Sequence, residues 1–383
     1  MLGWRKWTVP AGRTRSDSRA ANPGAAAAPG RLVDVILRSL SQINFRNLIT
    51  PSVDFCGGVN AIVGPNASGK SNLLEAAYLG CTGELASGKI GEALRIGTDE
   101  GFVGVKLERQ DGVASIDIGL SPGRRLIRVD GQVVRSYDLA RVAAAVLITP
   151  GDAELVHGSP SARRHYLDGL LSKLSRRYAM LHREYLRVVE QRNSMLRQAP
   201  TDATLGVWTD RLVQLGQEIV ALRHRAVKRV AEVAARTYRE IAPRGRGLDI
   251  VLYGEEAPDL RHALQQSSSE EMARGMTIVG PHRDDLKLTL DGYSIQGYGS
   301  RGEARTSALA LRVAEYRLLH EKHGEPPVLL LDDYTAELDG DRRDYLLQLA
   351  GTTPQALVTG TMPPPAWERR FTVEDGAVNL YAT

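Results

Sequence analysis

A glycine-rich segment, residues 64–71, constrains the fold of this chain more than any other part of the sequence. It reads Gly-Pro-Asn-Ala-Ser-Gly-Lys-Ser and fits the pattern G-x-x-x-x-G-K-[S/T]. An apolar run, residues 61–63, precedes it, and Leu73, Leu74 and Ala77 follow at helical spacing. Glycines let backbone N–H groups close around phosphate oxygens, and the helix directs its positive end toward them. The segment therefore predicts an α/β fold that binds nucleotide phosphates.

Two further sequence features supply the charged groups that such a site needs. In the phosphate loop, Lys70 would neutralise the β- and γ-phosphates, and Ser71 would ligate Mg²⁺. The apolar run at residues 328–331 ends in Asp332 and Asp333, which places both carboxylates at the carboxyl edge of a sheet, beside the loop. We expect Asp332 to hold Mg²⁺, directly or through water, and Asp333 to polarise the attacking water.

A third motif, Ser-Arg-Gly-Glu at residues 300–303, precedes a helical pattern. Serine followed three residues later by glutamate is a capping box, so one interpretation is a well-capped helix. The same geometry offers a helix N-terminus to an anion. The two interpretations are compatible, and both stay open.

Apolar periodicity divides the chain into an α/β body and a helical arm. Apolar residues from Tyr166 to Val188, and again from Leu205 to Ala226, recur at intervals of three and four, which predicts two long helices in an antiparallel hairpin. Asp130-Gly131 predicts a tight hairpin turn. The remaining predictions are strands near residues 35–37, 40–45, 60–63, 102–107, 115–120, 125–135, 286–290, 327–331 and 356–359, with helices from about residue 70, at 303–322 and near 340–350.

These patterns predict three parts. Residues 32–150 and 275–383 form the α/β body, residues 151–274 form an inserted helical arm, and residues 1–31 form a disordered basic extension. The extension lacks the apolar core of a secretory signal, and a non-native or misplaced start is the interpretation we prefer.

Charge is distributed unevenly along the chain. The sequence has 49 Lys+Arg and 45 Asp+Glu, a net charge of +4. Residues 161–246 contain 18 Lys+Arg and 8 Asp+Glu, and residues 1–31 contain six and one, so the remainder is acidic. A basic block in an otherwise acidic protein is typical of polyanion binding. Long exposed helices also carry arginine on solvated faces, so charge alone leaves both interpretations open.

Composition excludes several other classes of protein. With 43% hydrophobic residues the chain is neither disordered nor a disulfide scaffold. We expect its two cysteines, Cys56 and Cys81, to be reduced thiols. The longest apolar run, residues 142–148, is too short to span a bilayer, so we expect a cytoplasmic protein without a membrane segment. No zinc-ligand spacing occurs, and we interpret His282 as a structural histidine in a tight turn.

The motifs occur in an order that is typical of one family. From about residue 35 to its end, the chain resembles the RecF recombination-mediator family, which consists of ATP-binding-cassette-type ATPases similar to the heads of SMC proteins. The resemblance rests on Ile-Asn-Phe-Arg-Asn-Leu at 43–48, the phosphate loop, Thr-Pro-Gly-Asp at 149–152 with Gly-Ser-Pro-Ser-Ala-Arg-Arg at 158–164, Gly-Pro-His-Arg-Asp-Asp at 280–285, Ser-Arg-Gly-Glu at 300–303, Leu-Asp-Asp-Tyr-Thr-Ala-Glu-Leu-Asp at 331–339 and Thr-Gly-Thr at 359–361.

The resemblance implies a P-loop ATPase head of the ABC type with an inserted, coiled-coil-like arm. RecF proteins bind ATP, dimerise around it, associate with DNA and hydrolyse ATP slowly. They act with RecR and RecO at gapped DNA to load RecA. We therefore expect ATP and Mg²⁺ as cofactors, an ATP-dependent homodimer, and hydrolysis that serves as a switch for DNA binding.

The resemblance also implies roles for individual residues. Asp339 would lie at the dimer seam, and Thr359, Gly360 and Thr361 occupy the switch position, where transporter ATPases usually have histidine. Ser300, Arg301, Gly302 and Glu303 would act in trans on the partner's nucleotide. Within the basic block, the candidates for binding DNA are Arg223, Arg225, Lys228 and Arg229. The residues expected to bind nucleotide are Arg46, Gly64, Pro65, Asn66, Ala67, Ser68, Gly69, Lys70, Ser71 and Asn72.

The sequence departs from the family pattern at two positions. Glu303 stands where glutamine is common, so its carboxylate has to bend back to its own helix cap to avoid repelling a γ-phosphate. Asp333 is one methylene shorter than the usual catalytic glutamate, which favours slow hydrolysis. Two alternatives remain: the nucleotide-binding subunit of a membrane transporter, opposed by Thr359 to Thr361 and the basic arm, and a P-loop kinase for a small molecule, which would not need the motif at 300–303.

Overall fold

A six-stranded sheet positions the predicted site. The computed structural model describes residues 35–86, 88–109, 112–198, 202–254, 259–335 and 340–381, so the predicted extension, residues 1–31, lies outside the described residues. Every neighbouring pair in the sheet is parallel except the edge pair β14 and β15. The strand order is β15 (Ala377–Leu380), β14 (Arg369–Glu374), β3 (Gly58–Val63), β13 (Gln355–Gly360), β12 (Val328–Leu331) and β8 (Ala145–Ile148).

Each face of this sheet is buried in its own hydrophobic core. On β12, Leu329 and Leu331 belong to one core, whereas Val328 and Leu330 belong to the other. Successive side chains of a strand point to opposite faces, so a strand buried on both sides has to be apolar throughout. This requirement accounts for the uninterrupted apolar run that the sequence carries before Asp332.

A second, antiparallel sheet covers one face, and α1 (Lys70–Thr82) contacts strands of both sheets. The Asp130-Gly131 turn between β6 and β7 is confirmed, with φ of 48° and 80°, as a two-residue hairpin requires. Residues 35–45, expected as two segments, form mainly one strand, whose register shifts between Leu37 and Ser39. The strand order in this antiparallel sheet is β2 (Ser52–Asp54), β1 (Ile36–Ile43), β4 (Gly101–Arg109), β5 (Gly112–Ser121), β6 (Arg124–Val129) and β7 (Gln132–Val134).

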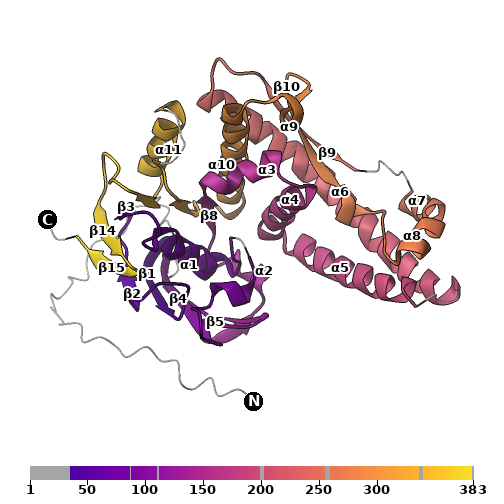
Figure 1. Ribbon diagram of the computed structural model, residues 1–383, viewed down its shortest axis with the longest axis horizontal. Helices are drawn as coiled ribbons and strands as arrows, with labels where there is room; N and C mark the ends of the chain where they lie inside the picture. The colour runs from indigo at the N-terminus through magenta and orange to yellow at the C-terminus, as the bar shows by residue number, and fades with distance from the viewer. Residues whose placement is uncertain are drawn as a thin grey trace, which may run out of the picture. The chain divides into compact units, whose positions relative to one another are not determined.

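The predicted helical hairpin is present as α5 (Arg176–Leu196) and α6 (Asp202–Ile241), which run side by side in Figure 1. The ion pairs Arg177–Glu218 and Arg211–Glu184 show that the two helices are antiparallel. The first helix was expected to begin before Tyr166, but it breaks at Ser175, whose hydroxyl accepts a hydrogen bond from the amide of Tyr178 and caps α5.

The chain before the break forms α4 (Pro160–Leu174). Residues of α4, α5 and α6 share one hydrophobic core with the second half of the body, and the described residues form one unit. The boundaries of the arm, residues 151–274, stay a prediction. The remaining elements are α2 (Ser136–Leu139), α3 (Glu154–His157), β9 (Leu248–Tyr253), α7 (Leu260–Gln266), α8 (Ser268–Arg274), β10 (Asp285–Leu290), β11 (Tyr293–Ser294), α9 (Ile295–Tyr298), α10 (Arg301–His323) and α11 (Gly340–Thr352), with 3-10 turns at Ile90–Ala93, Pro150–Ala153 and Pro281–Arg283. No helix among the described residues is long and apolar enough to cross a membrane.

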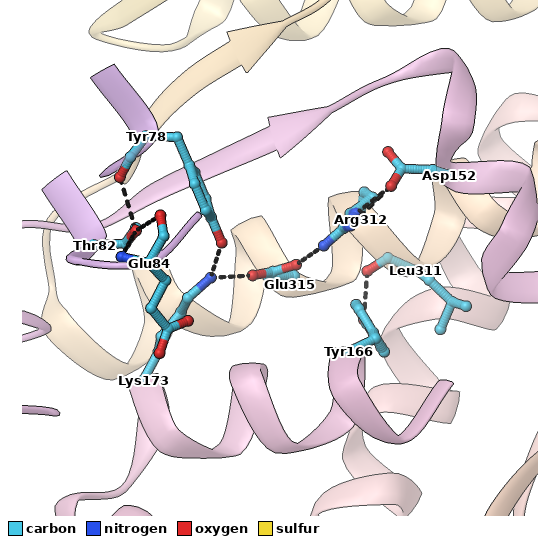
Figure 2. A network of polar contacts seen from close by, with 9 residues as sticks. All are labelled: Tyr78, Thr82, Glu84, Asp152, Tyr166, Lys173, Leu311, Arg312 and Glu315. Carbon is cyan, nitrogen blue, oxygen red and sulfur yellow. Dashed lines mark hydrogen bonds and ion pairs between the residues drawn. The ribbon is translucent and has the colours of Figure 1, made fainter. Parts of the chain in front are cut away.

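A buried chain of alternating charges joins α1, α4 and α10 (Figure 2). The Lys173 ammonium lies 3.0 Å from the Tyr78 hydroxyl and 2.8 Å from the Glu315 carboxylate. Arg312 contacts Glu315 at 2.9 Å and Asp152 at 2.8 Å. Burial opposes charge on Lys173 and Glu315, but each faces the other, so the pKa of Lys173 is raised and that of Glu315 is lowered. Because each charge has a partner, the network can stay ionised inside the protein.

The prediction that Arg223 binds DNA is wrong in this structure, because its side chain is buried. Only 1% of the residue is exposed, and its guanidinium lies 2.6 Å from Asp168 and 2.9 Å from Asp284. It also donates to the Tyr178 hydroxyl at 2.9 Å and to the Pro281 carbonyl. Arg223 therefore fixes the arm helices to the loop at residues 280–285.

We expect Arg223→Met to lower the free energy of unfolding by about 3–5 kcal/mol, because it leaves two carboxylates in a mostly buried site without their cation. Chemical denaturation measures the change. Arg225→Met, two residues along the same helix at an exposed position, is the matched control and should stay within about 0.5 kcal/mol of wild type. Equal stability of the two variants would show that the buried network is not a structural requirement.

Candidate nucleotide-binding site

The predicted phosphate loop connects β3 to α1, as the sequence indicated. Ala67 and Gly69 have φ of 63° and 113°, so the backbone turns sharply just before the helix. Gly69 is the N-cap of α1, no side chain caps it, and no acidic residue occupies the first turn. The first N–H groups of the helix therefore lack the side-chain acceptor that usually satisfies them, an arrangement that suits an anion.

Close contacts restrict the conformation of the phosphate loop. A Cβ at Gly64 would lie 2.2 Å from the Val373 carbonyl oxygen, so only glycine fits there. Lys70 curls back over the loop and donates to the carbonyls of Gly64 at 2.9 Å and Pro65 at 2.7 Å. The buried Ser68 hydroxyl has no hydrogen-bond partner, and a polar atom left in this way is suited to a ligand oxygen.

The two predicted magnesium residues lie together. The Ser71 hydroxyl donates to Oδ1 of Asp332 at 2.9 Å. The same oxygen accepts a hydrogen bond of 2.7 Å from the hydroxyl of Thr359, at the predicted switch position. The Thr359 oxygen in turn accepts from the amide of Asp333 at 2.8 Å. One buried threonine hydroxyl therefore links both acidic residues at the carboxyl edge of the sheet.

The backbone around Asp333 is held in an unusual conformation. Its φ is 45°, which is uncommon for a residue other than glycine, and its carboxylate accepts from the Thr335 hydroxyl at 2.8 Å. Gly360 accepts a backbone hydrogen bond of 3.3 Å from Gly64, so the switch position touches the phosphate loop directly. Thr361 follows at an exposed position.

The segment around Arg46 lies against the start of α1. Arg46 has φ of 43° and pairs with Glu75 on α1, with Nη2 2.8 Å from Oε1. Asn47 accepts from Asn72 at 2.8 Å, and its amide lies so close to Gly69 that a Cβ there would be 2.9 Å away. Neither Asn47 nor Glu75 was among the residues predicted to bind nucleotide. The position of Asn47 directly after Arg46 is the signal that could have identified it.

The motif at residues 300–303 forms the expected capping box. The Ser300 hydroxyl accepts from the Glu303 amide at 3.2 Å, and Glu303 accepts from the Ser300 amide at 2.8 Å. The Ser300 amide hydrogen bond, together with Arg246 at 2.8 Å, lowers the pKa of Glu303. Its carboxylate thus bends back, as the sequence required. Arg301 is exposed, the Gly302 carbonyl accepts from Arg342 at 2.8 Å, and Asp339 lies outside the described residues.

His282 and the two cysteines are the other residues that the sequence singled out. His282 lies 2.7 Å from the Tyr185 hydroxyl and 3.1 Å from the Thr277 carbonyl, and burial lowers its pKa to about 4. His282 thus lies in a hydrogen-bonded tight turn, as expected, and its structural role stays a prediction. Cys56 and Cys81 are free thiols.

The three other DNA-binding candidates are exposed on α6. Arg229 lies 2.9 Å from Glu321 and 3.2 Å from Glu232, and such exposed pairs are weak. Of the ion pairs formed by the described residues, none involves Arg225 or Lys228, so both cations can reach a polyanion.

The site fits ATP and Mg²⁺. The uncapped helix start, the Ser68 hydroxyl and Lys70 suit phosphate oxygens. The described residues contain no cluster of three or more His, Cys, Asp or Glu that could hold a metal. Mg²⁺ does not need one, because it usually takes one or two protein oxygens together with phosphates and water. Ser71 and Asp332 are such a pair.

Comparison with known proteins agrees with this geometry. A family model described as "RecF/RecN/SMC N terminal domain" matches residues 36–363. The chain is 48% identical over 333 residues to the DNA replication and repair protein RecF of Deinococcus radiodurans, which covers 87% of this chain and 92% of that protein. Its counterpart from Deinococcus deserti is 46% identical over 351 residues and covers 90% and 97%.

Solved structures give the same result. The structure described as the recombination mediator protein RecF with ATP in the RecFOR pathway has a TM-score of 0.86 and 29% identity, and covers 93% of this chain and 100% of that chain. An SMC head domain from Pyrococcus furiosus, 16% identical with a TM-score of 0.52, covers 91% and 96% and shares the fold alone. The chain belongs to the RecF family of DNA replication and repair proteins.

Proposed function

We propose that this protein is an ATP-gated switch that binds DNA during recombinational repair. ATP closes a homodimer on gapped DNA, slow hydrolysis reopens it, and with RecR and RecO the closed form directs the loading of RecA. The observation that carries the proposal is the hydrogen-bond chain from Ser71 through Asp332 and Thr359 to Asp333. It connects the phosphate loop to the predicted hydrolytic carboxylate. The relative described with ATP supports the choice of nucleotide.

Different residues of the site bind the nucleotide and support its hydrolysis. Lys70 and the first amides of α1 bind the phosphates. Ser71 and Asp332 would hold Mg²⁺, which supplies positive charge to the phosphates when bound. Asp333 orients water, but the Thr335 hydroxyl occupies one of its oxygens at 2.8 Å. The Asp333 side chain is short, and one of its oxygens already accepts a hydrogen bond. Both features make it a poor group for orienting water, which supports the slow hydrolysis that a switch requires.

The start of α10 supports a site shared between two subunits. Ser300 and Arg301 are exposed, and Glu303 is directed back to the Ser300 amide and to Arg246. The helix therefore offers Ser300, Arg301 and Gly302 to a partner's phosphates without a repelling carboxylate. In the proposed dimer these residues act in trans.

Asp333→Asn should keep ATP binding and dimerisation while hydrolysis falls by about two orders of magnitude, because only the group that orients water is lost. Phosphate release and nucleotide binding are measured on the same preparation. Asp344→Asn, an exposed carboxylate on α11, is the control and should hydrolyse ATP normally. Wild-type turnover in the Asp333 variant would assign the hydrolytic role to another group.

Ser300→Arg should leave ATP binding to the monomer intact but abolish ATP-induced dimerisation, because a bulky cation would obstruct the shared site. Sedimentation with a non-hydrolysable ATP analogue measures association, and Ser269→Arg at an exposed position of α8 is the control. Lys70→Met removes the charge that faces the β- and γ-phosphates. A mixture of the Ser300 and Lys70 variants should recover association through one intact composite site. No recovery between two folded chains would exclude a trans role.

Replacing Arg225 and Lys228 with glutamine should reduce the salt dependence of DNA binding. If each side chain contacts one phosphate, the slope of the logarithm of the binding constant against the logarithm of the salt concentration flattens by about 1.8, since each duplex phosphate contributes about 0.9. Fluorescence anisotropy at several salt concentrations gives the slope. Lys106→Gln with Arg124→Gln removes the same charge from exposed positions of β4 and β6 and should leave the slope unchanged. Equal slopes for both pairs would contradict DNA binding by this face of α6.

A further inference from the structure

A cavity of about 780 Å³ lies outside the nucleotide site, where the antiparallel sheet meets the first helices of the arm. Its walls come from β6, β7, α2, α4 and α5, and none of its lining residues belongs to the phosphate loop. We refer to it as the β7 cavity. Lys173 of the charged network in Figure 2 forms part of its wall.

The charges on the wall of the β7 cavity do not cancel. Asp138 is neutralised by Arg176 at 2.8 Å, and Lys173 by Glu315. Glu84 faces Arg125 and acts on it electrostatically. Two more cations, Arg135 and Arg183, line the cavity from α2's N-cap and from α5, and both are exposed.

Among the ion pairs of the described residues, none involves Arg135 or Arg183, so the cavity wall carries two arginines with no carboxylate of their own. Such groups attract anions, and a charge-assisted hydrogen bond is about twice as strong as a neutral one. Guanidinium groups are particularly suited to carboxylates, which match their planar pairs of N–H donors. The wall therefore selects for a negatively charged occupant.

Several aliphatic residues line the cavity: Leu126 and Ile127 of β6, Val133 and Val134 of β7, and Ala179 of α5. Successive side chains of a strand point to opposite faces, so the paired residues Ile127 and Val134 share one face of the ribbon, whereas Leu126 and Val133 lie on the other. Val133 is 64% exposed, so its side chain is accessible to an occupant. The occupant should accordingly bring apolar side chains as well as negative charge.

The strand beside the cavity has a free backbone edge. β7 is the last strand of its sheet and pairs only with β6, through Ile127–Val134, Arg128–Val133 and Val129–Gln132. Its other edge therefore has no strand partner within the described sheet. Edges of this kind accept an extended peptide as an additional strand, with alternate side chains directed into adjacent pockets.

We infer that the β7 cavity is a docking site for an extended acidic segment of a partner protein, in which carboxylates alternate with aliphatic residues. The carboxylates contact Arg135 and Arg183, and the aliphatic side chains cover Val133 and its neighbours. Single-stranded nucleic acid fits less well, because its bases stack on aromatic side chains, and Tyr137, already beside Arg176, is the one aromatic residue among those that line the cavity.

The test uses the full chain and a short fluorescein-labelled peptide in which aspartate and valine alternate. We expect wild type to bind this peptide, and the double variant Arg135→Glu/Arg183→Glu to bind it at least about tenfold more weakly, the equivalent of about 1.4 kcal/mol. The matched control is Arg124→Glu/Arg187→Glu, which makes the same charge change at exposed positions of β6 and α5 that do not line the cavity. It should retain wild-type affinity.

A second variant and a second measurement keep the result independent of folding. Val133→Asp changes one exposed side chain. It should weaken binding of the peptide while the thermal unfolding temperature of the protein stays unchanged. Hydrogen exchange of residues 132–134, which already pair with β6, should slow further when the peptide is bound. No binding to wild type, or equal weakening by both arginine pairs, would overturn the proposal. A loss confined to labelled oligothymidylate would assign the cavity to nucleic acid and overturn it as well.

Discussion

The buried chain of charges from Asp152 through Arg312 and Glu315 to Lys173 sets how the parts of this protein lie relative to one another. It joins the helix that starts at the phosphate loop, the helix that starts at Ser300, and the first helix of the arm. Each ion is expensive to bury and is tolerated only while its partner is in place. Separating α4 from α10 would leave the Lys173 ammonium without its carboxylate, and moving α1 away would remove the Tyr78 hydroxyl from the same ammonium, so we regard the three helices as one rigid group.

The chemistry of the site follows from a sheet that is parallel at its centre. Parallel strands bring their carboxyl ends to one edge, and here β3, β12 and β13 deliver the phosphate loop, Asp332 and Thr359 to the same place. The apolar strands need no polar residue until they leave the core, which is why the functional groups occur directly after them. Thr359 connects these groups, because its hydroxyl donates to Asp332 and accepts from the amide of Asp333.

Local patterns predicted much of this arrangement. The phosphate loop, the Asp130-Gly131 turn and the helical hairpin each depend on neighbouring residues and were found where expected, and membership of the RecF family removes the transporter and kinase alternatives. Arg223 was misjudged because its carboxylate partners, Asp168 and Asp284, are 55 and 61 residues away in the chain. Contacts of that kind leave no periodic trace in the sequence. The helix break at Ser175 was missed because the apolar spacing continues across it.

The order of strands in the central sheet has a consequence for how the chain is made. Both neighbours of β3 in this sheet, β13 and β14, come from residues 355–374, and β8 pairs with β12. While the ribosome synthesises the first half of the chain, the strand before the phosphate loop has no partner in its own sheet. Contacts of such high sequence separation form late and leave strand edges exposed. A nascent chain that stops before residue 355 would hold the phosphate loop on a strand without its partners β13 and β14, so we expect nucleotide binding to begin only after residues 355–374 have been synthesised.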